Sequence, residues 1–325
     1  MRSPRSTASL LKPPYSWAIL RSGGPSCATP TLVKDFRESG MLDLTNLYRP
    51  KSAEEAVRAL LEGEGTGLYV AGGTIVVPTG SPSLDYLVDL TDAGLDYVEV
   101  EDTSDGRVLA IGATTRIADL SLSPELASPA LRALLEATTD LGTHTVRNRA
   151  TVGGNLYAAH FPSDLPPAFL ALGASVRLQG ADGPREVSLE DFYARRSEVY
   201  RRGDLIVEVR VPGGHEDLAS AFEKTGRTRV DVAIVNCAAA VTVSGGTIEA
   251  ARVALNGVSA VPSVAAEAGA YLTGKSPTED VFREAGRLVS ESVSPRGDHR
   301  ASADYRRKVA GVMTTRALSR AAGLS

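Results

Sequence analysis

The sequence predicts an α+β fold in two domains, residues 41–213 and a smaller one at residues 214–325. The chain has 325 residues, more than one hydrophobic core usually organises, and 43% of them are hydrophobic. Apolar segments of the first part switch irregularly between strand-like and helix-like periods, without repeated βαβ units. The second part follows a Pro-Gly-Gly linker at 212–214, and its strand-like segments precede its helix-like ones.

Residues 1–40 are expected to be a disordered or wrongly assigned extension. They mix Arg, Ser, Pro and Gly without apolar periodicity, and no signal-peptide core or cleavage site follows Arg2 and Arg5. A clear pattern begins only at Met41, shortly before a helix-like repeat. We therefore expect the native chain to start at Met41.

Local signals place the elements of the first domain. Ser52 and Glu55 have the spacing of a capping box, so a helix is expected to begin after Ser52. A short apolar strand at 68–71 leads directly into Gly72-Gly73. Further elements are expected as strands at 86–90, 97–100, 108–111, 174–178 and 206–211, and as helices at 117–122, 129–138 and 166–172.

The second domain is expected to be a separate α+β unit. Three apolar segments, 219–224, 233–243 and 248–255, predict an antiparallel meander. Helices are expected to follow near 264–272, 280–290 and 305–322.

Composition argues against several classes of function. The net charge of -4 and pI near 5.7 provide no basic field for nucleic acid. Apolar runs such as 232–243 are too short to span a membrane. The two cysteines, Cys27 and Cys237, form no CxxC motif and cannot hold an iron–sulfur cluster. With four scattered histidines, a metal site has no support either, and a reduced cytoplasmic chain is expected.

Two glycine pairs are the strongest candidates for ligand binding. Gly72-Gly73 follows a strand, and Gly153-Gly154 lies between Thr151 and Asn155. Glycine permits positive φ, so successive amides in each segment are expected to point into one concavity that suits a phosphate. Two such nests side by side would hold a diphosphate. Neither has the GxGxxG spacing of a Rossmann turn.

The ordered motifs resemble the FAD-binding subunits and domains of molybdenum hydroxylases, which include the medium subunits of carbon monoxide dehydrogenase and the flavin domain of xanthine dehydrogenase. The resemblance covers nearly everything after Met41 and implies a PCMH-type FAD-binding domain followed by a CO dehydrogenase flavoprotein C-terminal domain. The motifs that carry it are Tyr-Arg-Pro at 48–50, AGGT at 71–74 with Pro78, IGATTR at 111–116, TVGGN at 151–155, DLPPAFLALGA at 164–174, FEKTGRTRVDVAIVN at 222–236 and SADYRR at 302–307.

The resemblance implies FAD as the cofactor and a set of residues around it. Backbone amides of the glycine segments, with Thr74 and Asn155, would wrap the pyrophosphate and ribityl chain. Asp164 would accept hydrogen bonds from FAD, and Lys224 would place a positive charge near the flavin ring. The implied cofactor-binding residues are Tyr69, Val70, Ala71, Gly72, Gly73, Thr74, Ile75, Val76, Val77, Thr114, Thr115, Leu141, Thr151, Gly153, Gly154, Asn155, Asp164, Val207 and Lys224.

Simpler roles remain open for several of these positions. Asp164 also suits the N-cap of the helix at 166–172, a role compatible with cofactor contact. Lys224 also suits a solvated strand end, whereas Leu141 and Val207 also suit the core. Arg227 and Asp231 are expected to form a local ion pair.

The segment at 160–162 departs from the family pattern, because His160-Phe161-Pro162 moves the proline by one residue. Tyr157, His160 and Phe161 are candidates to stack on or gate the flavin ring. The favoured interpretation is a structural loop whose aromatic side chains face the core.

By resemblance, the chain is the FAD subunit of an oxidoreductase like xanthine dehydrogenase or carbon monoxide dehydrogenase, and it has no catalytic residue of its own. A large molybdenum-cofactor subunit would oxidise the substrate, and a small subunit with two-iron two-sulfur clusters would relay electrons. FAD would then pass them to NAD, a quinone or oxygen, within a hetero-oligomer. The alternatives are a free-standing flavoprotein oxidoreductase and a structural subunit that has lost flavin.

Overall fold

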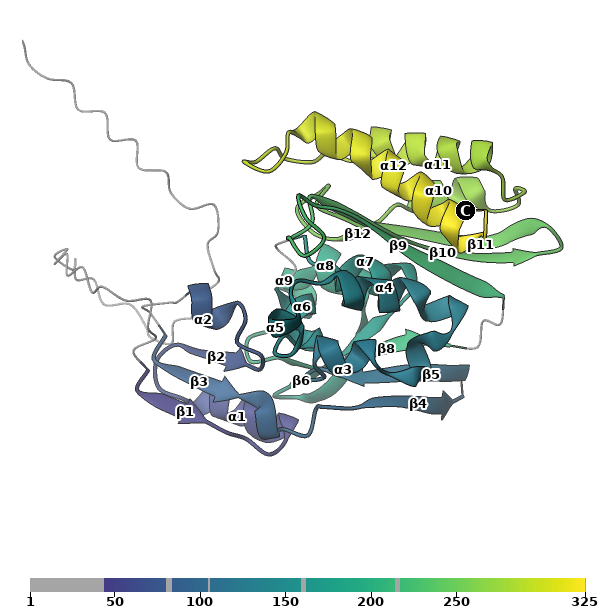
Figure 1. Ribbon diagram of the computed structural model, residues 1–325. Helices are drawn as coiled ribbons and strands as arrows, with labels where there is room; N and C mark the ends of the chain where they lie inside the picture. The colour runs from purple at the N-terminus through teal and green to yellow at the C-terminus, as the bar shows by residue number, and fades with distance from the viewer. Residues whose placement is uncertain (1–43, 80–83, 105, 159–161, 214–216, 325) are drawn as a thin grey trace, which may run out of the picture.

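Three β-sheets organise the part of the chain that the computed structural model describes, residues 44–79, 84–104, 106–158, 162–213 and 217–324 (Figure 1). A small parallel sheet has the order β1-β3-β2, an antiparallel sheet the order β4-β5-β8-β6-β7, and a second antiparallel sheet the order β12-β11-β10-β9. The strands are β1 (Asn46–Tyr48), β2 (Gly67–Val70), β3 (Tyr86–Asp89), β4 (Val98–Thr103), β5 (Gly106–Gly112), β6 (Ser175–Gly180), β7 (Gly183–Ser188), β8 (Leu205–Pro212), β9 (Leu218–Thr225), β10 (Val235–Ser244), β11 (Thr247–Asn256) and β12 (Ser263–Val264).

Helices cover these sheets on several faces. The α-helices are α1 (Ala53–Glu62), α2 (Val76–Thr79), α3 (Ile117–Ser121), α4 (Arg132–Asp140), α5 (His144–Arg147), α6 (Val152–Tyr157), α7 (Leu165–Ala171), α8 (Leu189–Ala194), α9 (Arg196–Val199), α10 (Ala266–Leu272), α11 (Glu279–Ser292) and α12 (Ala303–Ala321). Three short 3-10 helices, η1 (Leu90–Asp92), η2 (Pro124–Ala127) and η3 (Pro129–Leu131), occur among the described residues.

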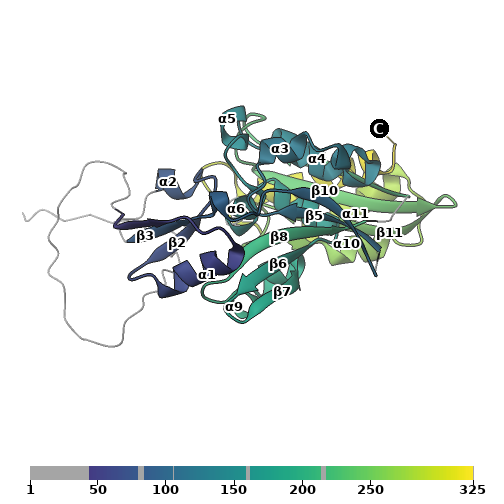
Figure 2. The same cartoon turned by 90° about the horizontal axis from the view of Figure 1, so that it is seen from below.

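The small parallel sheet lies with α1 at one end of the molecule (Figure 2). The predicted helix start at Ser52 is confirmed, because the Ser52 hydroxyl accepts from the Glu55 amide at 3.2 Å. The Glu55 carboxylate in turn accepts from the amide of Lys51, one residue before the cap. Tyr86 is buried under α1, and its hydroxyl donates to the carbonyl of Leu60 at 2.7 Å.

Helices α4 and α7 lie between the two antiparallel sheets (Figure 1). Helix α4 contacts β9, and α7 contacts β10 and β11. One continuous hydrophobic core includes Ile111 of β5, Phe169 of α7, and Phe222 and Ala238 of the C-terminal sheet. The opposite face of that sheet packs on α10, α11 and α12 in a second core. The two halves of the chain therefore share a core, whereas a separate C-terminal unit was expected.

Most predicted elements are confirmed, including the antiparallel meander of β9, β10 and β11. The sequence patterns missed several short elements, among them β1, β7, α5, α8 and α9, which have only three to six residues. Such short segments show too few alternations to reveal a period. The prediction for residues 1–40 lies outside the described residues.

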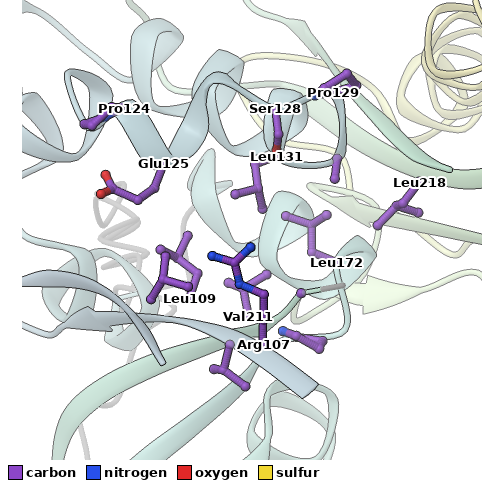
Figure 3. Close-up of a pocket in the computed structure, with 15 residues that line it drawn as sticks. Arg107, Leu109, Pro124, Glu125, Ser128, Pro129, Leu131, Leu172, Val211 and Leu218 are labelled. Carbon is purple, nitrogen blue, oxygen red and sulfur yellow. The ribbon is translucent and has the colours of Figure 1, made fainter. Parts of the chain in front are cut away.

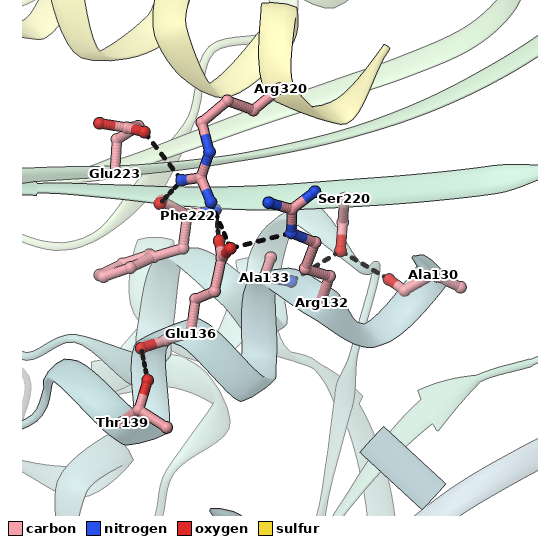
Figure 4. A network of polar contacts seen from close by, with 9 residues as sticks. All are labelled: Ala130, Arg132, Ala133, Glu136, Thr139, Ser220, Phe222, Glu223 and Arg320. Carbon is pink, nitrogen blue, oxygen red and sulfur yellow. Dashed lines mark hydrogen bonds and ion pairs between the residues drawn. The ribbon is translucent and has the colours of Figure 1, made fainter. Parts of the chain in front are cut away.

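An ion-pair network ties the two halves together at α4 (Figure 4). Glu136 accepts from the Phe222 amide of β9 at 2.9 Å, and it pairs with Arg320 of α12. Arg320 also forms an ion pair with Glu223 at 2.8 Å. The half-exposed Arg132 forms an ion pair with Glu136 at 2.9 Å. The network fixes α4 against the C-terminal sheet.

Replacing Glu136 by Ala is expected to lower the free energy of unfolding by about 2 kcal/mol, because Arg320 and the Phe222 amide lose a charged, partly buried acceptor. The control Arg132→Ala removes a half-exposed member and is expected to change stability by about 0.5 kcal/mol or less. Urea unfolding measures both variants. Equal losses of stability would contradict the central role of Glu136.

Candidate functional site

The first glycine segment forms a tight turn between β2 and α2. Gly73 has φ of 68°, and its carbonyl accepts from the Val77 amide at 3.1 Å. Within the described part of the chain, the amides of Gly72, Gly73 and Thr74 donate to no protein acceptor. Three successive available N–H groups beside a left-handed glycine form the kind of concavity that binds phosphate.

This turn packs directly on the residues that precede the second glycine segment. A Cβ built on Gly72 would lie 1.8 Å from the carbonyl oxygen of Arg149, so only glycine fits there. The Arg149 guanidinium in turn contacts the Gly72 carbonyl at 3.4 Å. The first glycine turn therefore lies against the segment that leads into the second glycine pair.

The second glycine segment is a capped helix start, and the expectation of a positive-φ nest at Gly153-Gly154 is wrong. The Thr151 hydroxyl accepts from the Gly154 amide at 3.3 Å and begins α6. The Gly153 amide donates to Ala113 at 2.8 Å, and the Asn155 amide to Thr151 at 2.9 Å. A Cβ on Gly153 would lie 2.7 Å from that of Ala113. Glycine is needed here for close packing, and these amides already have acceptors.

Two buried oxygen atoms near this junction lack a hydrogen-bond partner among the described residues, Thr114 Oγ1 and Asn155 Oδ1. A buried polar atom without a partner is rare in native proteins and is commonly satisfied by a ligand or water. Thr115 differs, because its hydroxyl bonds the backbone of Tyr97. Unpartnered oxygen atoms beside free amides fit a ligand that carries both hydroxyl and phosphate groups.

Asp164 and Lys224 form a buried ion pair at 2.7 Å, with side-chain exposures of 6% and 5%. Asp164 stands at the N-cap position of α7 but makes no capping hydrogen bond, so that expected role is wrong. Its second carboxylate oxygen accepts from Asn236 at 2.9 Å. Lys224 is likewise not solvated. Its ammonium group also donates to the Asp140 carbonyl at 2.9 Å.

Burial raises the pKa of the Asp164 carboxyl to about 6, and Lys224 and Asn236 oppose the rise. The ionised carboxylate neutralises the lysine charge. A flavin at this site would meet a paired Lys224 rather than an isolated cation, which weakens the attraction expected for a reduced, negatively charged ring.

Backbone contacts connect this ion pair to the glycine segments. Lys224 holds the end of α4 at Asp140, and Arg147 of α5 donates to the next two carbonyls, at Leu141 and Gly142. The chain then reaches Arg149, against which Gly72 packs. These contacts run from Asp164 and Lys224 through residues 140–149 to Gly72 and are called the glycine strip.

The remaining predicted positions serve mainly as a frame. Leu141 and Val207 are buried in separate cores, as the simpler interpretation held. The carbonyl of Val207 accepts from the Ala113 amide at 3.0 Å and so supports the strand end beside Thr114. The Tyr69 hydroxyl donates to Gly203 at 2.7 Å, and burial raises its pKa.

His160 and Phe161 lie outside the described residues, but Tyr157 can be placed. The Arg196 guanidinium lies 4.3 Å from the centre of the Tyr157 ring and donates to the Tyr157 carbonyl at 3.0 Å. Tyr200 packs beside the ring. Tyr157 is thus engaged within the protein, in line with the favoured structural interpretation. The predicted local pair of Arg227 and Asp231 is present at 3.1 Å.

Sequence reasoning missed two residues of the strip, Arg149 and Asn236. Arg149 follows no motif that separates it from a solvated arginine. Asn236 carried a usable signal, because it interrupts the apolar run of a buried strand, where an amide must find a partner.

A cleft of about 690 Å³ lies elsewhere, between η2, η3 and the ends of β4, β5 and β8 (Figure 3). Leu131, Val211 and Leu218 line it, and Arg107 points into it. It includes none of the predicted cofactor residues. The glycine strip, not this cleft, is the candidate site.

The described ranges also bear on metal sites, reactive cysteines and membrane-spanning helices. No group of three or more His, Cys, Asp or Glu side chains there is arranged to hold a metal ion. Cys237 is buried as a free thiol, and burial raises its pKa to about 12. No helix in those ranges has the length and apolarity needed to cross a membrane.

Comparison with known proteins identifies the family of the chain. Residues 41–214 match the FAD binding domain in molybdopterin dehydrogenase, and residues 220–321 match the CO dehydrogenase flavoprotein C-terminal domain. The chain belongs to this family of FAD-binding subunits. These matches confirm FAD as the cofactor and confirm the expected two-part α+β fold.

Two relatives align with most of this chain over nearly all of their own length. The glyceraldehyde dehydrogenase medium chain of Sulfolobus acidocaldarius is 31% identical over 84% of this chain and 97% of its own length. The carbon monoxide dehydrogenase medium chain of Afipia carboxidovorans is 32% identical over 84% of this chain and 95% of its own. Both names describe subunits of oxidoreductases, and the present flavoprotein is a FAD-binding subunit of the same class.

Solved structures agree with these relatives. Carbon monoxide dehydrogenase from Hydrogenophaga pseudoflava superimposes with a TM-score of 0.79 at 31% identity, over 87% of this chain and 99% of that one. Quinoline 2-oxidoreductase from Pseudomonas putida 86 gives a TM-score of 0.75 at 28% identity, over 85% and 96%.

Asp164 is expected to make the stability of the flavoprotein fall as pH rises from about 4 to 6. Its pKa is about 6 when folded and about 3.9 when unfolded, so only the folded state holds its proton in this range. The charged groups facing it are Lys224 and Asp140, which is paired with Arg229.

Urea unfolding at several pH values tests this, with Asp164→Asn expected to flatten the slope. Asp191→Asn is the control, because Arg195 lowers the pKa of that exposed carboxyl and it titrates below the window. An unchanged slope in Asp164→Asn would contradict the assignment.

Proposed function

We propose that this chain is the electron-transferring FAD subunit of a molybdenum hydroxylase complex. The observation that carries the proposal is the turn at 72–74, whose amides donate to no acceptor among the described residues and which packs on Arg149 just before α6. FAD, when bound, supplies the redox chemistry, since it accepts two electrons and releases them to an acceptor. The protein binds, orients and tunes it.

The site residues divide by the kind of contact they offer. Amides of the 72–74 turn would bind the pyrophosphate. Thr114 and Asn155 would satisfy their unpartnered oxygen atoms on cofactor hydroxyl groups. The ion pair of Asp164 and Lys224 would lie beside the remaining polar groups of FAD. The other residues at 69–77, 115, 151–154 and 207 would form a frame that holds these contacts in place.

We further propose the wider context of the subunit. Residues 41–213 would form the flavin domain and residues 214–325 the C-terminal domain. Electrons would come from a small subunit with two-iron two-sulfur clusters, served by a large molybdenum-cofactor subunit, and would leave to NAD, a quinone or oxygen. The similarity to oxidoreductase medium chains supports these partners, and the free, buried Cys237 is in keeping with a cytoplasmic location.

Gly73→Ala is expected to weaken FAD binding at least about tenfold, because an L residue strains the left-handed turn and redirects its amides. The matched control is Gly274→Ala, with φ of 80°, open space around the added Cβ and a position on the C-terminal domain. Both variants should lose about 1 kcal/mol of stability. Titration of the apoprotein with FAD, followed by flavin fluorescence, measures the difference.

Equal FAD affinity in Gly73→Ala and wild type would contradict the proposed role of the turn. A wild-type protein that remains colourless after FAD is added would instead support the structural-subunit alternative.

Co-expression tests the electron-transfer role. The tagged chain, produced together with the products of neighbouring reading frames, is expected to copurify with two further chains and to show iron–sulfur absorption beside the flavin bands. Reduction by the substrate should bleach the flavin only in the complete complex. A monomer that oxidises a small organic donor alone would favour the free-standing flavoprotein.

A further inference from the structure

Three polar side chains form a row across neighbouring strands of the C-terminal sheet. Asn236 of β10 is the register partner of Lys224 on β9 and of Asn256 on β11. All three are buried, and Asn236 has no solvent exposure. Further along β10, alanines occupy the same face in the shared core. The polar row therefore marks an interruption in an otherwise apolar surface.

All three side chains reach the start of α7. Lys224 and Asn236 each bond one oxygen of the Asp164 carboxylate, at 2.7 and 2.9 Å. The Asn236 amide group also donates to the Ser163 carbonyl at 3.0 Å, and Asn256 donates to the same carbonyl at 3.3 Å. The row thus fixes both the backbone and the carboxylate at this point.

The two carboxylate oxygens have different partners, which sets the orientation of the group. An ammonium and an amide N–H both favour the ionised carboxylate, whereas burial disfavours it. Loss of the amide donor would leave Lys224 alone to hold a buried charge. The Asn236 carbonyl oxygen has no partner among the described residues, so the side chain is engaged through its NH₂ group.

We infer that Asn236 is a positioning residue of the flavin site, which acts through Asp164 by keeping its carboxylate ionised and oriented. The inference rests on the proposed function, because Asp164 is taken to contact FAD. It adds a second side chain of the C-terminal sheet, beside Lys224, to the groups that hold the Asp164 carboxylate.

The decisive variant is Asn236→Asp in the full chain, which keeps the size of the side chain but changes its hydrogen bonding. The new carboxyl donates to Asp164 only when it is protonated. The FAD affinity of the Asn236→Asp variant is compared with that of wild type at the same pH. It is expected to be about tenfold lower at pH 8 and within about threefold of wild type at pH 5.5. Flavin fluorescence titrations measure this ratio.

Cys237→Ala is the matched control, because it changes the next residue of β10, which lies in the other core. It should reduce stability but leave the FAD affinity ratio near one at both pH values. Asn236→Ala is the second variant. It should move the midpoint of the pH dependence of FAD affinity upward, since Asp164 loses a donor that favours its ionised form.

The outcomes separate the two proposals. A wild-type chain that binds no FAD overturns both the proposed function and this inference. Normal wild-type binding with a pH-independent ratio in Asn236→Asp overturns the inference alone. If Asn236→Asp does not fold, an unshifted midpoint in Asn236→Ala overturns the inference and a raised midpoint supports it.

Discussion

The buried ion pair between Lys224 and Asp164 joins three parts of the flavoprotein that are distant in sequence. Lys224 lies on β9, Asp164 begins α7, and the second bond of Lys224 holds the end of α4 at Asp140. Removing one partner of such a pair leaves an uncompensated buried charge, which is strongly destabilising. The ends of α4 and α7 are therefore fixed together, and the strip that leads to Gly72 starts from this fixed point.

The glycine motifs show that one sequence pattern can have several physical causes. Gly72 is required because the Arg149 carbonyl occupies the space of a side chain, whereas Gly73 is required by its left-handed backbone. Gly153 lets α6 approach Ala113. Gly154 lies in the capped first turn of α6, where a built Cβ would have the Thr151 hydroxyl as its near neighbour. The two pairs look alike in sequence, yet only the first retains free amides.

Most elements of the fold could be predicted from local sequence signals. The pairing of residues distant in sequence could not. Capping at Ser52 and the alternating strands of the meander depend on residues close in sequence, so their patterns were visible. The TVGGN segment was misjudged because a Gly-Gly pair suggests a turn, although Thr151 also offers an N-cap. The pairing of Asp164 with Lys224, sixty residues apart, leaves no periodic trace. The sequence analysis treated Asp164 as a cofactor ligand and Lys224 as a separate cation, and only the folded structure shows that they form an ion pair.

The predicted division of the sequence near residue 213 does not coincide with a division of the hydrophobic core. Helices α4 and α7 belong to the first half, yet they fill the layer beneath β9, β10 and β11, and Phe222 shares a core with Phe169. Glu136 and Arg320 add charged contacts across the same layer. Removing the C-terminal half would expose this apolar layer and leave Asp164 without Lys224 and Asn236. The C-terminal sheet is therefore a structural part of the candidate flavin site.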